Sequence, residues 1–198
     1  MSETVMPSSP PVIALILAAG RGRRFGSDKR RASLPSGARL LASTVALAQR
    51  CFAEVYVVLR PEDEPQLLGL GAGVKIVRCA AADLGMGHSL AAGVRAVAEL
   101  RSKAVAVLLG DMPWIAESSL QHLANAADPE RIVFPLYAGE RGHPVIFGRR
   151  YWRELEALTG DQGAKAVLSG HEEAWLGIEL DDPGVLLDVD IPEALSVG

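Results

Sequence analysis

The stretch VIALILAAGRGRRFGSDK, from Val12 to Lys29, decides how the rest of the chain is interpreted. It opens with an uninterrupted apolar run, residues 12–18, directly after Pro10 and Pro11. Such a run is typical of a strand that is buried on both faces of a parallel sheet. Glycines and basic side chains follow at once. Glycines let the backbone approach a ligand closely, and successive N–H groups in such a turn bind phosphate oxygens. The sequence therefore predicts a strand that leads into an anion-binding loop.

The loop does not follow either of the two commonest glycine-rich patterns. It lacks the consecutive GK[ST] of a P-loop, and Gly20, Gly22 and Gly26 do not fall at GxGxxG spacing. On spacing alone, a tight strand-to-helix turn with solvated arginines explains it as well. Other motifs must therefore decide between a phosphate site and an ordinary turn.

Length and composition favour one α/β domain that meets its anionic ligand locally. The chain has 198 residues and 49% hydrophobic content, which is enough to bury a sizeable core. A net charge of -4 and a pI near 5.6 argue against a nucleic-acid partner. Six of the 20 Lys and Arg residues nevertheless fall within residues 21–31. We expect phosphate to bind at that stretch.

The ends and the cysteines indicate a cytoplasmic protein. Residues 1–11 are polar and proline-rich and lack the apolar centre of a secretory signal, so we expect a disordered lead-in before a domain over residues 12–198. No apolar run reaches the roughly 20 residues needed to cross a bilayer, so no membrane partner is expected. Two cysteines, Cys51 and Cys79, do not make a disulfide framework, and we interpret them as buried thiols.

The first two thirds of the chain alternate between strand and helix patterns. The expected strands cover residues 12–18, 55–59, 75–79 and 104–109, and the expected helices cover residues 41–52, 89–100 and 117–126. This alternation predicts a single-domain, Rossmann-like fold with a mostly parallel sheet flanked by helices.

After Arg131 the pattern is less regular, and we expect this half to face a second substrate. Apolar segments cover residues 132–136 and 144–147, and helical patterns cover residues 151–158 and 163–168. A last strand is predicted over residues 185–191, with Pro192 at the start of a short helix.

Three aspartates are candidates for metal binding. Asp111 directly follows the buried run 104–109, and open α/β sheets bind ligands at the carboxyl ends of such strands. An aspartate there can hold Mg²⁺ against phosphates, or it can cap the helix that starts after Pro113. A second carboxylate is expected from Asp188 or Asp190, which alternate with Val189 and point to one side of the chain.

The segment LAAGRGRRFGSDK closely resembles the signature LAAGxGxRxGxxK of nucleotidyltransferases with a glycosyltransferase-A-like fold, in particular the molybdenum cofactor cytidylyltransferases. Further motifs agree in order: GMGHSL at 85–90, GDMP at 110–113, GHPV at 142–145, GDQGAK at 160–165 and DVDIPEAL at 188–195. The resemblance spans nearly the whole chain beyond residue 11. In one respect the chain departs from the family, because Arg30 and Arg31 follow Lys29 where apolar residues are usual.

The resemblance implies a role for each matching residue. The family's first loop cradles the nucleotide, and the residues matching its arginine and lysine, with the strand-end aspartate, are the implied catalytic residues: Arg24, Lys29 and Asp111. The implied nucleotide-binding residues are Leu17, Ala18, Ala19, Gly20, Gly22, Gly85, Gly87 and Ser89. Ser89 also fits a simple helix N-cap. The implied metal ligands are Asp111 and Asp190. The implied acceptor-binding residues are His143, Asp161 and Gly163, and His143 fits a structural role equally well.

The resemblance also implies the reaction. A phosphate of molybdopterin carrying molybdenum attacks the α-phosphate of CTP, receives CMP and releases pyrophosphate, with Mg²⁺ as the ion and Mn²⁺ as its substitute. The acceptor is already an anion, so no general base is needed. This explains why the motifs hold cations and paired carboxylates without a Ser-His or Cys-His arrangement. A client molybdoenzyme is a further implied partner.

Two alternatives remain open. The first keeps the chemistry and changes the substrate, to that of a guanylyltransferase or of a sugar- or polyol-phosphate nucleotidyltransferase. Related guanylyltransferases tend to have LAGG, so the methyl group of Ala19 favours the smaller base. The second alternative is a non-catalytic, nucleotide-binding maturation chaperone for molybdoenzymes, against which the intact Lys29 and Asp111 count.

Overall fold

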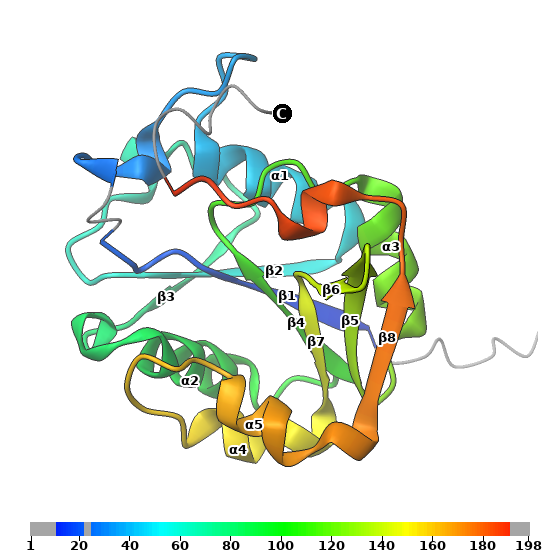
Figure 1. Ribbon diagram of the computed structural model, residues 1–198. Helices are drawn as coiled ribbons and strands as arrows, with labels where there is room; N and C mark the ends of the chain where they lie inside the picture. Colours follow the sequence, from blue (N-terminus) through cyan, green and yellow to red (C-terminus); the bar gives the residue numbers. More distant parts are fainter. Residues whose placement is uncertain (1–10, 22–24, 191–198) are drawn as a thin grey trace, which may run out of the picture.

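A mixed β-sheet runs through the middle of the molecule and carries helices on both faces (Figure 1). The computed structural model describes residues 11–21 and 25–190. Within them, the sheet has eight strands: seven follow the order β3-β2-β1-β4-β7-β5-β6, and the eighth, β8, pairs with β5. This is the single-domain α/β architecture that the alternating pattern predicts.

The parallel half of the sheet contains four strands. These are β1 (Val12–Leu17), β2 (Glu54–Leu59), β3 (Lys75–Arg78) and β4 (Ala104–Leu109). β1 lies between β2 and β4, parallel to both, with Leu17 opposite Val58 and Leu109. Because all four strands run the same way, their carboxyl ends meet at one edge of the sheet.

The second half adds strands of mixed direction. These are β5 (Ile132–Tyr137), β6 (Glu140–Arg141), β7 (Val145–Gly148) and β8 (Trp175–Glu179). β7 pairs antiparallel with β4 and β5, whereas β8 runs parallel to β5. The sheet is therefore mostly parallel on one side and mixed on the other.

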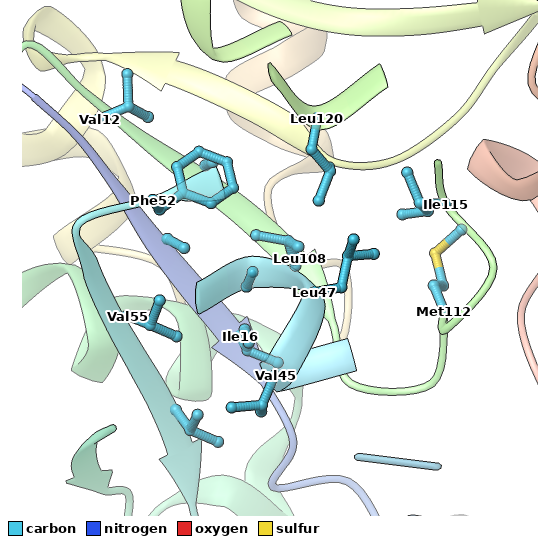
Figure 2. Close-up of a cluster of buried hydrophobic side chains, with 14 of the residues drawn as sticks. Val12, Ile16, Val45, Leu47, Phe52, Val55, Leu108, Met112, Ile115 and Leu120 are labelled. Atoms are coloured by element: carbon cyan, nitrogen blue, oxygen red, sulfur yellow. The ribbon is translucent and has the colours of Figure 1, made fainter. Parts of the chain in front are cut away.

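Helices cover each face and form two hydrophobic cores. α1 (Leu40–Cys51) and α3 (Glu117–Ala126) pack on one face. α2 (Met86–Val97), α4 (Trp152–Glu156) and α5 (Lys165–Gly170) pack on the other. Successive side chains of β1 alternate between the two cores, and Figure 2 shows Val12 and Ile16 pointing to the α1 side. Burial on both faces explains the continuous apolar run in this strand.

Two expectations about individual elements were wrong. α2 begins at Met86, not at Ser89, because its first turn packs against the backbone near residue 160. The strand expected over residues 185–191 does not form among the described residues. The segment Pro183–Leu186 is a 3₁₀ helix capped by the Asp182 side chain, and residues 187–190 have no regular structure.

The other strands and helices expected within the described residues agree with the structure to within about two residues, apart from short strands that the patterns did not indicate. The lead-in before residue 11 and the helix expected at Pro192 lie outside the described residues. β6 has two residues and β8 alternates poorly, so neither carries a strong strand signal. Both cysteines are free thiols: Cys79, just after β3, is buried as expected, whereas Cys51, at the end of α1, is only half-buried. In the part of the chain that the structure describes, no helix has the length and apolarity to cross a membrane.

Candidate active site

A cavity of about 510 Å³ lies at the carboxyl ends of β1 and β4. This is the edge of an open α/β sheet at which ligands usually bind. Its walls come from the loop after β1, the start of α2, the turn after β4 and the segment 188–190. The lining residues include Leu17, Ala18, Ala19, Gly20, Arg21, Lys29, Arg30, Asp83, Gly85, Ser89, Asp111, Asp161, Asp188 and Asp190.

Three carboxylates gather at one end of the cavity. One ligand atom from each of Asp111, Asp188 and Asp190 lies within 4.8 Å of the others. The backbone brings them together, because the Val189 N–H donates to the Asp111 carbonyl oxygen at 3.0 Å. The sequence left Asp188 and Asp190 as alternatives for the second carboxylate. The structure places both beside Asp111.

Lys29 supplies the cation that faces this cluster. Its Nζ donates to Asp111 Oδ2 at 2.5 Å, to the Val189 carbonyl oxygen at 3.1 Å and to Asp190 Oδ1 at 3.3 Å. Burial lowers the pKa of Lys29, but hydrogen bonds and attraction from Asp111 and Asp190 outweigh it, so the pKa is raised overall. The ammonium group is therefore charged at neutral pH.

The donor set suits a hard divalent cation. Carboxylate oxygens are the ligands that Mg²⁺ and Mn²⁺ prefer, and three of them converge here. Burial raises the pKa of the Asp188 carboxyl, and the neighbouring Asp190 and Asp111 raise it further. One ammonium does not balance three carboxylates, so a bound cation would relieve the remaining repulsion.

Asp111 does not cap the following helix. The N-cap of α3 is Ala116, which has no side-chain cap, and the N–H of Ala116 donates instead to Asp182 Oδ2 at 2.9 Å. The capping interpretation of Asp111 is therefore wrong, and its carboxylate faces Lys29 in the cavity.

The loop after β1 begins as a rigid extension of the sheet. The N–H of Ala18 donates to the Val58 carbonyl oxygen at 3.1 Å, and the N–H of Gly110 donates to the Leu17 carbonyl oxygen at 3.0 Å. Gly20 has no heavy atom within 4 Å of the place where a β-carbon would lie. A ligand can therefore approach its backbone closely. Gly22 and Arg24 lie outside the described residues.

The glycines of GMGHSL have a packing role. A β-carbon on Gly87 would lie 2.6 Å from the Thr159 carbonyl oxygen, and the Gly87 N–H donates to the Gly160 carbonyl oxygen at 2.8 Å. Gly85 has a φ of +125° and packs against the same segment. Gly85 also lines the cavity, whereas Gly87 is absent from its lining. The start of α2 is thus held against the loop before α5.

Ser89 is not an N-cap. It is the fourth residue of α2, it is buried, and it lines the cavity. The N-cap position is Gly85, which has no side chain to offer. The capping interpretation of Ser89 is therefore wrong, whereas its position agrees with contact to a ligand.

The residues expected at the acceptor are divided. Asp161 lines the cavity, but His143 and Gly163 are absent from its lining. Gly163 has a φ of +54° and packs near Met86. The His143 N–H donates to the Val185 carbonyl oxygen at 2.8 Å, and its Nδ1 is buried without a hydrogen-bond partner among the described residues. Burial lowers the pKa of His143.

Two arginines in the cavity wall were not assigned from the sequence. Arg21 forms a two-pronged ion pair with Asp83, which joins the loop after β1 to the segment before α2. Arg30 is buried among carboxylates. The density of basic residues does not tell a solvated side chain from a buried one, and the departure from the family pattern at Arg30 did not indicate its partners.

Comparisons with known proteins show the family to which the chain is similar. The model of the MobA-like NTP transferase domain matches residues 14–174. The purine catabolism protein PucB of Bacillus subtilis is 32% identical over 93% of this chain and 94% of its own. The molybdenum cofactor guanylyltransferase of Rhodobacter capsulatus is 33% identical, with 93% of each chain covered.

A solved structure of matching fold is that of Rv0371c from Mycobacterium tuberculosis, in complex with manganese. It has a TM-score of 0.77 and 24% identity, and the alignment covers 93% of this chain and 95% of the other. The fold, the order of the motifs and the family match lead to one conclusion. The chain is a nucleotidyltransferase that belongs to the MobA-like NTP transferase family.

Proposed function

We propose that this nucleotidyltransferase transfers CMP from CTP to the phosphate of a molybdopterin-type acceptor, with release of pyrophosphate. The observation that carries the proposal is the cavity itself. It joins the loop after β1, a charged lysine and three carboxylates at the carboxyl ends of β1 and β4. The choice of CTP and a molybdopterin-type acceptor as substrates rests on the motifs that resemble the molybdenum cofactor cytidylyltransferases.

The carboxylates of Asp111, Asp188 and Asp190 would hold Mg²⁺, with Mn²⁺ as a substitute. The converging oxygen donors support this assignment, and the Rv0371c structure of matching fold is a manganese complex. A divalent cation in such a site neutralises phosphate charge and the charge that develops on the leaving pyrophosphate.

Lys29 would contact the triphosphate. Its ammonium group bonds to Asp111 and Asp190, the carboxylates that would hold the ion, so from this position it would also meet a phosphate oxygen bound to that ion. The backbone from Leu17 to Gly20 would line the nucleotide, and Arg24 would add a second cation. The acceptor phosphate is an anion before it attacks. Catalysis therefore rests on positioning and charge neutralisation, without a general base.

The preference for cytosine rests on Ala19. Its side chain is 3% exposed and forms part of the cavity wall, where a glycine would leave more space. The R. capsulatus relative is a guanylyltransferase, which makes GTP the substrate to test against CTP. We assign Asp161, at the cavity wall, to binding of the acceptor. His143 and Gly163, which lie outside the cavity lining, would support the loops around the acceptor site.

The test is pyrophosphate release from CTP, GTP, ATP and UTP, each with and without a molybdopterin acceptor. We expect release from CTP only when acceptor and Mg²⁺ are present, and we expect Ala19→Gly to narrow the preference for CTP over GTP. Release of pyrophosphate from GTP but not from CTP would overturn the cytidylyl assignment and leave the reaction class unchanged. Binding of nucleotide without any release would overturn the catalytic proposal in favour of a nucleotide-binding chaperone.

A further inference from the structure

Arg30 lines the cavity and yet is almost completely buried. Its side chain is 6% exposed, and it lies between Asp28 and Asp63. Asp63 is 33 residues further along the chain, in the loop after β2, and its side chain is 8% exposed. A buried arginine with two carboxylate partners differs from the solvated arginines of an ordinary basic loop.

The hydrogen bonds of Arg30 use the whole guanidinium group. Nε donates to Asp28 Oδ1 and Nη2 donates to Asp28 Oδ2, both at 2.8 Å. Nη1 and Nη2 donate to the two carboxylate oxygens of Asp63 at 2.6 and 2.8 Å, and Nη1 also donates to the Ala18 carbonyl oxygen at 2.8 Å. A guanidinium group has five N–H donors, and protein atoms accept from all of them. None is left for a phosphate.

These bonds join both ends of the loop after β1. Ala18 stands where the loop leaves the sheet, and its own N–H is bonded to β2. Asp28 stands where the loop returns, and its side chain caps the 3₁₀ helix Lys29–Arg31. Asp63 anchors the group to the rest of the fold, because it also accepts from the backbone N–H of Arg60 at 2.9 Å.

Lys29 is the residue that this arrangement holds in place. It is the direct neighbour of Arg30 and the first residue of the short helix that Asp28 caps. Its Nζ must meet Asp111 and Asp190 across the cavity. A shift of about 1 Å in such a group can cost on the order of a hundredfold in rate.

We infer that Arg30 is a positioning residue, which closes the base of the loop after β1 and thereby fixes Lys29 against the carboxylate cluster. The inference rests on the proposed role of Lys29 in binding the triphosphate. It gives a function to an arginine that the sequence left without a role. The two neighbours thus have different roles, since Lys29 faces the substrate and Arg30 acts only through Lys29.

Electrostatics support the arrangement. Burial raises the pKa of Asp28 and of Asp63, but hydrogen bonds from Arg30 outweigh that effect and lower both values overall. Lysine cannot reproduce this arrangement, because its three donors lie on one atom, whereas Arg30 forms five hydrogen bonds from three separate nitrogens.

The test combines Arg30→Met and Arg30→Lys with Lys29→Ala and measures turnover and CTP affinity. Each Arg30 variant alone should lower kcat at least about tenfold, and Arg30→Lys should not restore the kcat that is lost in Arg30→Met. In the Lys29→Ala background the Arg30 substitutions should cause no further loss of kcat, because the group they position is gone. The exposed Arg31→Met serves as the matched control and should leave kcat unchanged.

Independent effects would overturn the inference: a similar loss of kcat from Arg30→Met with and without Lys29, or normal kcat in Arg30→Met. If Lys29→Ala itself leaves turnover intact, the proposed role of Lys29 fails instead, so the two failures can be told apart. Should Arg30→Met not fold, Asp63→Asn replaces it, because it weakens the same anchor and leaves the guanidinium in place. Its loss of kcat should likewise vanish in the Lys29→Ala background, and persistence of the loss would refute the inference.

Discussion

Replacing Asp111 by asparagine separates a metal ligand from a structural aspartate. The Asp111 carboxylate accepts from Lys29 at 2.5 Å and lies within 4.8 Å of the Asp188 and Asp190 ligand atoms. Asparagine keeps the shape and an acceptor oxygen but removes the negative charge. The substitution therefore changes the electrostatics of the cluster with little change in packing.

Stability should change little, because two effects of Asp111→Asn oppose each other. The charge-assisted hydrogen bond from Lys29 is weakened, which costs about 1.5–3 kcal/mol at most. Repulsion among the carboxylates is relieved at the same time, and Asp188, whose pKa is raised by burial and by its neighbours, gains most. For a chain of this size 1 kcal/mol shifts Tm by about 2–4 °C, so we expect a change of only a few degrees.

Turnover by Asp111→Asn should fall by at least about a hundredfold. This is the loss seen when one strong electrostatic contact to a transition state is removed, and it corresponds to about 2.7 kcal/mol. Thermal melts and pyrophosphate release under saturating CTP and Mg²⁺ measure the two quantities on one sample. Excess Mg²⁺ should restore little.

Asp182 provides the matched control. It is buried, and its carboxylate accepts from the N–H groups of Ala116 and Gly184, both at 2.9 Å. Asp182→Asn should therefore lower Tm and leave turnover near normal. The assignment of Asp111 would be refuted if its variant behaved like that of Asp182, with a clear loss of stability and intact turnover.

Three further predictions concern other parts of the molecule. Lys29→Ala should weaken CTP binding by about 1.5–3 kcal/mol in calorimetry, whereas Arg31→Ala, a neighbouring exposed residue, should not; equal effects would contradict the placement of the lysine. Burial lowers the pKa of His143 below its usual 6.5, so the unfolded chain binds this proton first as pH falls. The contribution of His143 to stability is therefore full above about pH 6.5 and is lost below it. Denaturant titrations above and below about pH 6.5 measure this as the fall in the free energy of unfolding, which should be smaller for His143→Gln than for the parent protein. An equal dependence of the free energy of unfolding on pH in both proteins would count against burial of a neutral His143. Gly87→Ala would place a methyl group 2.6 Å from a backbone carbonyl oxygen and should cost about 1–3 kcal/mol by thermal melting, whereas Gly71→Ala meets nothing within 4 Å and should be neutral.

The parallel half of the fold could be predicted from the sequence because its strands are buried on both faces. Residues 12–18 and 104–109 are continuous apolar runs, and each became a central strand within one residue of the expected bounds. The end of the chain could not be predicted in this way. Val185 packs into the core from a 3₁₀ helix whose cap comes from Asp182, and apolar content alone does not tell such a helix from a strand.

Those parts of the candidate site could be predicted whose position follows from the course of the backbone. Asp111 follows a buried strand, so its place at the ligand-binding edge follows from the fold. Side-chain partners were not predictable in the same way. The sequence suggested an N-cap for Ser89, but the start of α2 is set by its contact with the backbone near residue 160. The sequence gave no role to Arg30, because that role depends on Asp63, which is distant along the chain.

Val189 explains how two carboxylates meet a third without a strand to hold them. Its side chain is fully buried in a small cluster with Phe25, Leu34 and Leu40. The carboxylates of Asp188 and Asp190, on either side of it, lie with that of Asp111. Phe25 and Leu34 flank the segment that carries Lys29, so one apolar cluster joins the loop with the ammonium group to the segment with the carboxylates. The separation between these opposite charges is thus set by this cluster, together with the hydrogen bond from Val189 to Asp111, rather than by the sheet alone.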